Sequence, residues 1–430
     1  MGISGKFKTA TVIGAVLMSL ASSAAFADDV AKPAQGGTLI YLEQQPHTNL
    51  YPPAGGFYPN GGVLNQITDK LTFQNPKTLE IEPWIAESWT VNDNATEYTF
   101  KLRKGVTFSD GSPLDANAVA KNFDTFGLGN KELKQPVSEV INNYDRSEVI
   151  DPLTVKFYFK KPSPGFLQGT SVIGSGLVSL ATLALPFEQL GDATKIVGSG
   201  PFVVESETLG KELSLKVRED YVWGPAKIEH HGRAYLDGIK YVITGEDSVR
   251  IGALLSGQAD FIRQVQAYDE AQVEGQGYKI YAAVSQQWAK LGVTLNVLAG
   301  DAGSRTVDDL DPAKTPVSPA MVGRADPDVI KSQYYPKNRD VLRQKGGPSD
   351  KVKSFVDNKL NGLLEALSSE PNREKRLQIA GEVQSYVLDQ AYAIPIFEEP
   401  QAYAGAPYLQ GVEFEAVGRP RFYSTWLAEH

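Results

Sequence analysis

The sequence predicts an α/β fold with mixed sheets, because strand patterns and helix patterns both run through its 430 residues in no regular order. Strand patterns alternate polar and apolar side chains, as in residues 97–102 and 151–159. Helix patterns repeat their apolar residues every three to four positions, as in residues 371–391. These observations disfavour a helical bundle and a β-sandwich. A chain of this length is also expected to divide into more than one domain.

Residues 1–27 have the pattern of a cleavable secretory signal peptide. Lys6 and Lys8 precede a run of apolar and small residues, and Ala25-Phe26-Ala27 fits the small-residue cleavage motif. A buried N-terminal helix is the alternative interpretation. No other stretch reaches the roughly 18 apolar residues that a membrane-spanning helix needs. We therefore expect an exported protein.

The composition restricts the compartment and the chemistry. The absence of cysteine excludes disulfides, thiolate metal sites, a cysteine nucleophile and a lipid anchor on cysteine. A formal net charge of -9 gives no electrostatic footprint for nucleic acid. The adjacent His230 and His231 are interpreted as loop residues, because neighbouring side chains do not face one another. We expect a monomeric periplasmic protein that carries no metal, no cofactor and no lipid anchor.

The first half of the chain contains residues that are typical of turns and helix caps. Asn92-Asp93-Asn94 is typical of a turn, because short amide and carboxylate side chains bond their own backbone. Asp115 is the expected N-cap of a helix with Val119, Phe123 and Phe126 on one face. The elements expected around them are a strand at 36–42, an irregular loop at 46–62, a short helix at 63–71 and strands at 97–102 and 151–159.

In the second half, residues 198–201 (Gly-Ser-Gly-Pro) lead into a strand, so they are not interpreted as a phosphate loop. Gly257 is the expected left-handed end of a helix that Asp247 or Ser248 caps. The other expected elements are a hairpin (202–204 with 213–217), strands at 239–243, 259–262, 293–297 and 394–397, and helices at 284–291, 352–367 and 371–391.

The last of these helices is expected to carry Pro371 in its first turn, where no backbone hydrogen bond is lost. Its expected inward residues are Leu377, Ala380, Val383, Val387 and Leu388. Arg419-Pro420-Arg421, near the end of the chain, is interpreted as a surface turn.

The segment from Ile81 to Pro113 resembles the signature of the family 5 extracellular solute-binding proteins, the peptide/nickel-binding receptors of ABC importers. It reads IEPWIAESWTVNDNATEYTFKLRKGVTFSDGSP. The matching residues are Glu82, Pro83, Trp84, Ala86, Glu87, Ser88, Trp89, Tyr98, Thr99, Phe100, Leu102, Arg103, Gly105, Val106, Phe108, Asp110, Gly111 and Pro113. Further similarity covers roughly residues 36–280 and 284–426, which is nearly the whole chain after the signal.

The resemblance implies a fold like that of type II periplasmic binding proteins, with two lobes, an extra subdomain, mixed sheets and discontinuous domains. The implied boundaries are 1–27 for the signal peptide, 36–62 plus 185–275 plus 405–430 for lobe I, 63–184 for the extra subdomain and 276–404 for lobe II. The resemblance breaks near residue 283, where the family carries a long segment that is missing here, so lobe II is expected to be shortened. A pruned lobe and an internally deleted variant are both open interpretations.

The resemblance also implies where a solute binds. Asp326 matches the aspartate that pairs with the α-amino group of a peptide ligand, although a turn at Asp326-Pro327-Asp328 is the alternative. Arg324 stands close to where the family often has tryptophan, which favours a ligand with a carboxylate or another anion. His47, Tyr51 and Tyr58 follow the first strand on a loop that faces the cleft in the family, and packing within that loop is their alternative.

The function that the resemblance implies is the periplasmic binding component of an ABC importer. Such a protein closes two lobes over a peptide-like or small amphipathic solute and delivers the solute to the membrane permease. No catalytic constellation is found in the sequence, so an enzyme is not expected. Two alternatives stay open: a secreted hydrolase that works with paired carboxylates, and a truncated variant that binds nothing.

Overall fold

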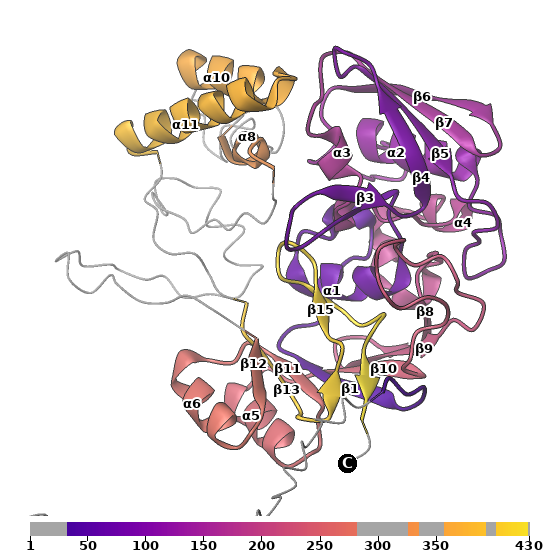
Figure 1. Cartoon of the computed structure of the whole chain (residues 1–430), viewed down its shortest axis with the longest axis vertical. Coiled ribbons are helices and arrows are strands. Elements are labelled where there is room, and N and C mark those ends of the chain that lie inside the picture. The colour runs from indigo at the N-terminus through magenta and orange to yellow at the C-terminus, as the bar shows by residue number, and fades with distance from the viewer. Residues whose placement is uncertain (1–31, 282–325, 335–356, 393–400, 429–430) are drawn as a thin grey trace, which may run out of the picture. The chain divides into compact units, whose positions relative to one another are not determined.

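The computed structural model describes residues 32–281, 326–334, 357–392 and 401–428 (Figure 1). The chain divides into a short unit, residues 1–32, and a second unit, residues 33–430, which contains all the described elements. The signal peptide and the elements expected at 284–291, 293–297 and 394–397 lie outside the described residues. Among the described helices, none combines the length and the apolar character needed to cross a membrane.

A seven-stranded mixed sheet with the order β12-β13-β11-β1-β10-β9-β8 forms one layer of the fold. Its central strand β1 is parallel to β10 and β11, while the other pairs are antiparallel. The strands are β1 (Thr38–Glu43), β8 (Phe202–Thr208), β9 (Glu212–Val217), β10 (Gly238–Ile243), β11 (Phe261–Arg263), β12 (Lys279–Tyr281) and β13 (Tyr403–Gly405). The predicted mixed sheet and the predicted hairpin are confirmed. The sheet joins segments that are far apart in the sequence. It does not fix where one domain ends and the next begins, so the exact domain boundaries stay predictions.

Two helices, α5 (Asp247–Leu255) and α6 (Ala267–Gly275), share an apolar cluster with this sheet. The predicted left-handed Gly257 is confirmed, with a φ of 73°. The predicted cap is wrong, since the N-cap is Glu246, whose side chain makes no capping hydrogen bond. The carboxylate of Asp247 pairs instead with the guanidinium of Arg250. Because of this ion pair, the carboxylate does not cap the backbone N–H groups at the start of the helix.

A second, four-stranded sheet has the order β4-β5-β7-β6, with strands β4 (Ala86–Val91), β5 (Glu97–Leu102), β6 (Tyr144–Asp151) and β7 (Thr154–Phe159). Helix α2 (Ala116–Leu128) begins where Asp115 accepts a hydrogen bond from Ala118 N at 2.8 Å, as predicted. Its Phe123 packs on Phe157 of β7, with ring centroids 4.8 Å apart. The strand predicted at 151–159 is confirmed over 154–159, which is β7, whereas residues 152–153 form the turn between β6 and β7.

Helix α1 (Tyr58–Ile67) occupies residues that were predicted to be partly loop. The prediction is wrong because Pro59 lies in the first turn, where proline is tolerated, and because glycines 61 and 62 serve packing rather than a turn. A Cβ at Gly61 would lie 2.6 Å from Nε of Arg419, so only glycine lets that side chain cross the helix. Antiparallel strands β2 (Thr72–Gln74) and β3 (Ile81–Pro83) follow α1.

Three helices of the later chain, α8 (Val329–Tyr334), α10 (Asn358–Ser369) and α11 (Arg373–Asp389), share a separate apolar cluster (Figure 1). Ala380, Val383 and Val387 are buried in it, as predicted. Leu377 and Leu388, which were also predicted to point inward, are 48% and 49% exposed. Pro371 precedes the N-cap Asn372, so it lies before the helix rather than in its first turn.

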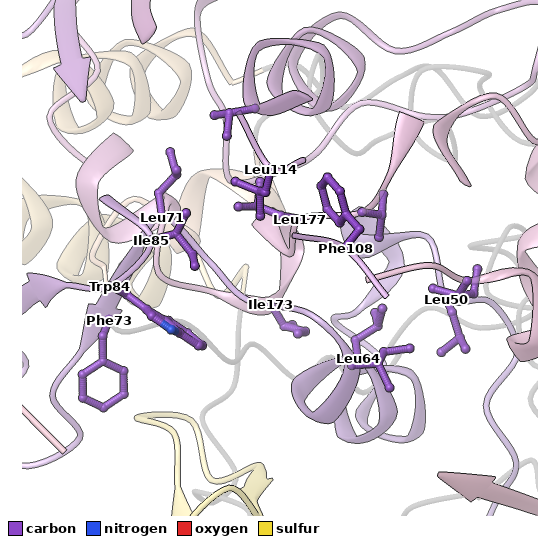
Figure 2. Packing of buried hydrophobic residues seen from close by; sticks show 14 of the residues in the cluster. Leu50, Leu64, Leu71, Phe73, Trp84, Ile85, Phe108, Leu114, Ile173 and Leu177 are labelled. Atoms are coloured by element: carbon purple, nitrogen blue, oxygen red, sulfur yellow. The ribbon is translucent and has the colours of Figure 1, made fainter. Parts of the chain in front are cut away.

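The remaining elements are short. They are η1 (Pro52–Ala54), α3 (Phe166–Gly169), η2 (Ile173–Ser175), α4 (Leu180–Leu183), η3 (Phe187–Gly191), η4 (Ala193–Lys195), β14 (Leu409–Gln410), β15 (Glu413–Phe414), β16 (Pro420–Arg421) and β17 (Trp426–Leu427). The main apolar cluster joins side chains of both sheets with side chains of α1 and α2, and Figure 2 shows part of it, including Leu64, Leu71, Ile85 and Ile173.

Replacing Gly200 with Ala is expected to lower the free energy of unfolding by about 1–3 kcal/mol, the usual cost of overpacking. A Cβ at this position would lie 2.5 Å from the carbonyl carbon of Ile67, at the end of α1. Urea unfolding followed by circular dichroism measures the loss. Gly210→Ala is not a suitable control, because Gly210 has a φ of 70°, whereas Gly252→Ala is suitable, since its Cβ would meet nothing within 4 Å. Equal midpoints for both variants would contradict the packing argument.

Candidate functional site

The described residues surround a hollow with about 710 Å³ of empty space, which includes open solvent at its mouth. Its lining comes from η1 and α1, from β2 and Trp84, from residues 138–140 and 168–174, and from the C-terminal residues 415–421. The hollow thus joins segments from both ends of the chain. Concave sites of this kind are the usual binding sites for small ligands.

One wall of the hollow is aromatic. Phe73 of β2 and Trp84, just after β3, meet edge to face with ring centroids 6.3 Å apart, and Figure 2 shows them next to each other. The indole Nε1 of Trp84 donates to the carbonyl oxygen of Trp223 at 3.1 Å, which fixes the ring. An apolar or amphipathic ligand group would find a rigid surface here.

The C-terminal side of the hollow is cationic. Nη1 of Arg419 donates to Glu415 at 2.6 Å, and Nη2 of Arg421 donates to Glu413 at 2.6 Å. The guanidinium of Arg421 also lies 4.5 Å from the ring centroid of Phe73. Both arginines are buried, so the interpretation of Arg419-Pro420-Arg421 as a surface turn is wrong. The signal that could have indicated burial is Phe422 and Tyr423 directly after them.

A third cation, Lys70, lies between α1 and β2 and lines the same hollow. Its Nζ donates to Oδ1 of Asn65 at 2.5 Å and lies 5.5 Å from the ring centroid of Trp84. Burial lowers the pKa of Lys70 to about 8, with Glu415 opposing the shift and Arg421 adding to it. Sequence reasoning missed this residue, because a single lysine before a short strand gives no signal of burial.

Among the predicted site residues that the structure describes, Tyr58 contacts the lining of the hollow. Its hydroxyl donates to the carbonyl oxygen of Val417 at 2.6 Å. Its ring lies 4.7 Å from the guanidinium of Arg419 and 4.7 Å from that of Arg263. Tyr58 therefore holds the C-terminal segment against α1, and a direct contact with a ligand stays a prediction.

Tyr51 and His47 lie away from this lining. Tyr51 is 1% exposed, packs edge to face on Phe126, and donates to the carbonyl oxygen of Pro136 at 3.1 Å. Nε2 of His47 lies 3.0 Å from a carboxylate oxygen of Glu207. These partners lie outside the loop, so both side chains tie the loop to neighbouring elements rather than packing within it. A role in binding stays a prediction for both residues.

Asp326 lies in the helical part of the later chain, and its carboxylate is buried against Arg376 of α11. Nη1 of Arg376 donates to Oδ2 at 3.0 Å, Nη2 bonds to Oδ1, and the backbone N of Asp328 donates to Oδ1 at 3.0 Å. Burial alone would raise the pKa of Asp326, but these hydrogen bonds and the charge of Arg376 hold it below its usual value. The geometry is that of the turn alternative. Arg324 lies outside the described residues.

Within the described parts of the chain, no three His, Cys, Asp or Glu side chains are grouped so that they could hold a metal ion. The ring of His230 lies 2.8 Å from the carbonyl oxygen of Arg233 through Nε2 and packs on Tyr235. The candidate binding site is therefore the hollow that Lys70, Arg419 and Arg421 line.

Part of the chain matches one family model. Residues 80–281 match the family model described as the middle part of bacterial extracellular solute-binding proteins, family 5. The glutathione-binding protein GsiB of Escherichia coli K12 is 27% identical over 244 residues, which is 56% of this chain and 45% of that protein. GsiB of Salmonella paratyphi A is 26% identical over the same share of each chain. The chain thus spans about 45% of the length of these curated relatives.

Solved structures show the same fold at low sequence identity. The oligopeptide-binding protein AppA of Bacillus subtilis, solved with a nonapeptide, has a TM-score of 0.66 at 16% identity, over 93% of this chain and all of that one. AgaA of Agrobacterium tumefaciens R10, solved with agropinic acid, has a TM-score of 0.70 at 18% identity, with 92% and 99% covered. NikA of Brucella suis, solved with Fe(III)-EDTA, has a TM-score of 0.65 at 17% identity, with 90% and 99% covered.

These neighbours are type II periplasmic binding proteins, which confirms the predicted fold class. The family match rests on the region that contains the predicted signature segment, and the matched relatives are binding proteins rather than enzymes. Residues 80–281, a little under half of the chain, therefore match the family 5 bacterial extracellular solute-binding proteins, and the described fold is that of type II periplasmic binding proteins.

Proposed function

We propose that this chain is the solute-binding component of an ABC importer, exported to the periplasm by its N-terminal signal peptide. It binds a peptide-like or small amphipathic solute without covalent chemistry and delivers the solute to the permease. The observation that carries the proposal is the hollow at the meeting of α1, β2, Trp84 and residues 415–421, which combines an aromatic wall with three cations and two carboxylates, Glu139 and Glu415. Charged side chains hold the polar end of a solute, and Phe73 and Trp84 accept the rest.

The family match supports this proposal, and the names of the related proteins suggest the probes. GsiB is named for glutathione, and solved neighbours hold peptides, agropinic acid or Fe(III)-EDTA. Members of one fold bind different solutes through different pocket side chains, so the fold does not name the solute of this chain. Contacts from Asp326, Arg324, His47 and Tyr51 to the solute remain part of the proposal, as does the monomeric state.

The test is a thermal-shift screen of the purified mature protein against glutathione, the dipeptide Met-Leu, agropinic acid and Fe(III)-EDTA. A solute at about a hundred times its dissociation constant is expected to stabilise the protein by about 2.7 kcal/mol. Arg421→Met is expected to weaken binding, because Arg421 lines the hollow, whereas the exposed Arg146→Met is the matched control. Chemical conversion of the bound solute would contradict a binding protein. A split melting transition without any ligand shift would favour the truncated variant.

A further inference from the structure

Lys70 is a buried ammonium group without an ion-pair partner among the described residues. The residue is 3% exposed, and its Nζ finds one acceptor there, Oδ1 of Asn65. Across the part of the chain that the structure describes, no carboxylate is close enough to form an ion pair with it, although Glu415 and Asp69 act on it at longer range. An ammonium carries three donors, and buried charges are normally paired because their desolvation is costly. This cation is therefore under-satisfied by the described residues.

Two neighbouring side chains, Asn65 and Arg421, also have a buried hydrogen-bond donor without an acceptor among the described residues. Asn65 must turn Oδ1 towards Lys70, since an ammonium cannot accept, and its Nδ2 is then buried without an acceptor among the described residues. Nε of Arg421 is buried in the same way, while its Nη2 is held by Glu413. Asn65, Lys70 and Arg421 all line the same hollow. Three unmet donors from α1, the loop before β2, and β16 thus gather at one place.

We propose that Lys70, Asn65 and Arg421 form an anion site in the hollow, and that this site takes a carboxylate group of the bound solute. The inference rests on the proposed function and goes beyond it by naming the class of solute. A carboxylate offers two oxygens that accept from several donors, and bonds with charged donors are stronger than neutral ones. A cationic group would be repelled, and a neutral amide would leave the ammonium without a counter-charge.

The surroundings explain why a solute carboxylate fits better than a fixed side chain. Glu415 and Glu413 are already engaged by Arg419 and Arg421, so neither is free to neutralise Lys70. Phe73 and Trp84 form the adjoining wall, which suits the carbon chain that carries the carboxylate. A small inorganic anion would satisfy the donors but would leave this wall bare. The arrangement therefore favours an organic acid or a peptide with a free carboxyl end.

Occupation of the site has a measurable electrostatic consequence. Burial holds the pKa of Lys70 at about 8, and a carboxylate placed beside it would raise that pKa. The charges that face Lys70 are Asp69 on its own segment and Glu415, Arg419 and Arg421 on the C-terminal segment. Since the site binds the protonated lysine, carboxylate affinity is expected to fall as the pH rises above about 8.

The experiment titrates glutarate, in place of chloride at constant ionic strength, into the mature protein and follows the melting temperature. Wild type is expected to show a saturable rise, and Lys70→Met is expected to weaken the apparent affinity at least about tenfold, the equivalent of 1.4 kcal/mol. Lys77→Met makes the same change at an exposed lysine and is expected to behave as wild type. Lys70→Gln is a second neutral variant in case Lys70→Met fails to fold.

The outcomes separate this inference from the proposed function. No saturable rise in wild type, or an equal rise in both Lys70 variants, overturns the carboxylate site. A rise with inorganic phosphate but none with glutarate also overturns it. A solute from the screen that binds wild type and Lys70→Met equally well preserves the proposed function and rejects the site. Glutarate binding that requires Lys70, without any solute from the screen, supports the site and counts against the tested solute classes.

Discussion

Asp326→Ala is expected to destabilise the helical cluster of α8, α10 and α11 by about 3–5 kcal/mol, even with no ligand present. The guanidinium of Arg376 is buried and makes two hydrogen bonds to the Asp326 carboxylate, so the substitution leaves a buried charge with its main partner gone. Asp328 is a weaker partner, because its carboxylate oxygen lies 3.9 Å from the guanidinium, within reach of an ion pair but beyond hydrogen-bond distance. Urea unfolding followed by circular dichroism at neutral pH measures the loss.

The matched control is Asp389→Ala, which removes an exposed carboxylate from the end of the same helix α11. The double variant Asp326→Ala with Arg376→Leu is expected to recover part of the loss, since it removes the buried guanidinium that has lost its hydrogen-bonded carboxylate. A stable Asp326→Ala protein that no longer shifts with amine-bearing solutes would contradict the stabilising role of the ion pair and support the proposed contact of Asp326 with the solute. The pair's contribution is present at neutral pH and is lost as the pH falls below the usual carboxyl pKa, because pairing depresses the pKa of Asp326.

Sequence patterns correctly predicted the elements whose structure depends only on residues within the element and next to it. Strand β5 has the predicted bounds, since its polar and apolar residues alternate without interruption. The cap at Asp115 and the left-handed Gly257 depend on one turn of chain each, and both are confirmed. Helix α1 was missed at its start because its glycines respond to a distant side chain, Arg419, which no window around residue 61 contains.

The candidate site was harder to predict for the same reason. Lys70 and Arg421 meet only through the tertiary fold, and neither belongs to a recognisable motif. Asp326 was selected by resemblance, yet the partner that occupies its carboxylate lies on a helix fifty residues later in the chain. Family resemblance identified the fold and the class of function, whereas the pairing of individual charges required the coordinates.

Asp69→Asn is expected to change the pH dependence of stability strongly between pH 4 and neutral pH. Asp69 is 0% exposed and accepts hydrogen bonds from the hydroxyl of Tyr221 at 2.9 Å and from Nε1 of Trp223 at 2.8 Å. Burial raises its pKa to about 7, with the hydrogen bonds from Tyr221, Trp223 and Ser199 and the charge of Lys70 opposing the shift. The folded protein therefore retains this proton to a higher pH than the unfolded chain does.

The sign of the effect follows from which state binds the proton. Between about pH 4 and pH 7 the unfolded chain has already released it, so wild-type stability falls by on the order of 4 kcal/mol from this group as the pH rises, and then levels off. Asparagine cannot ionise, so the variant lacks this fall. At pH 4 the variant is expected to be less stable than wild type by about 1–3 kcal/mol, because its amide nitrogen cannot accept the hydrogen bond that one carboxyl oxygen accepted.

Between pH 4 and pH 8, the free energy of unfolding of the variant is therefore expected to rise by about 4 kcal/mol relative to that of wild type. At pH 8 the variant is expected to be at least as stable as wild type. Urea unfolding of both proteins across this pH range measures the difference between their free energies of unfolding. In this difference the contributions of all other titrating groups cancel. Asp93→Asn, at an exposed turn, is the control and is expected to give a nearly constant difference. Parallel curves for Asp69→Asn and wild type would mean that Asp69 stays ionised when buried. In that case the negative charge of Asp69 would act on Lys70 from longer range throughout this pH range, and the carboxylate site would lose part of its driving force.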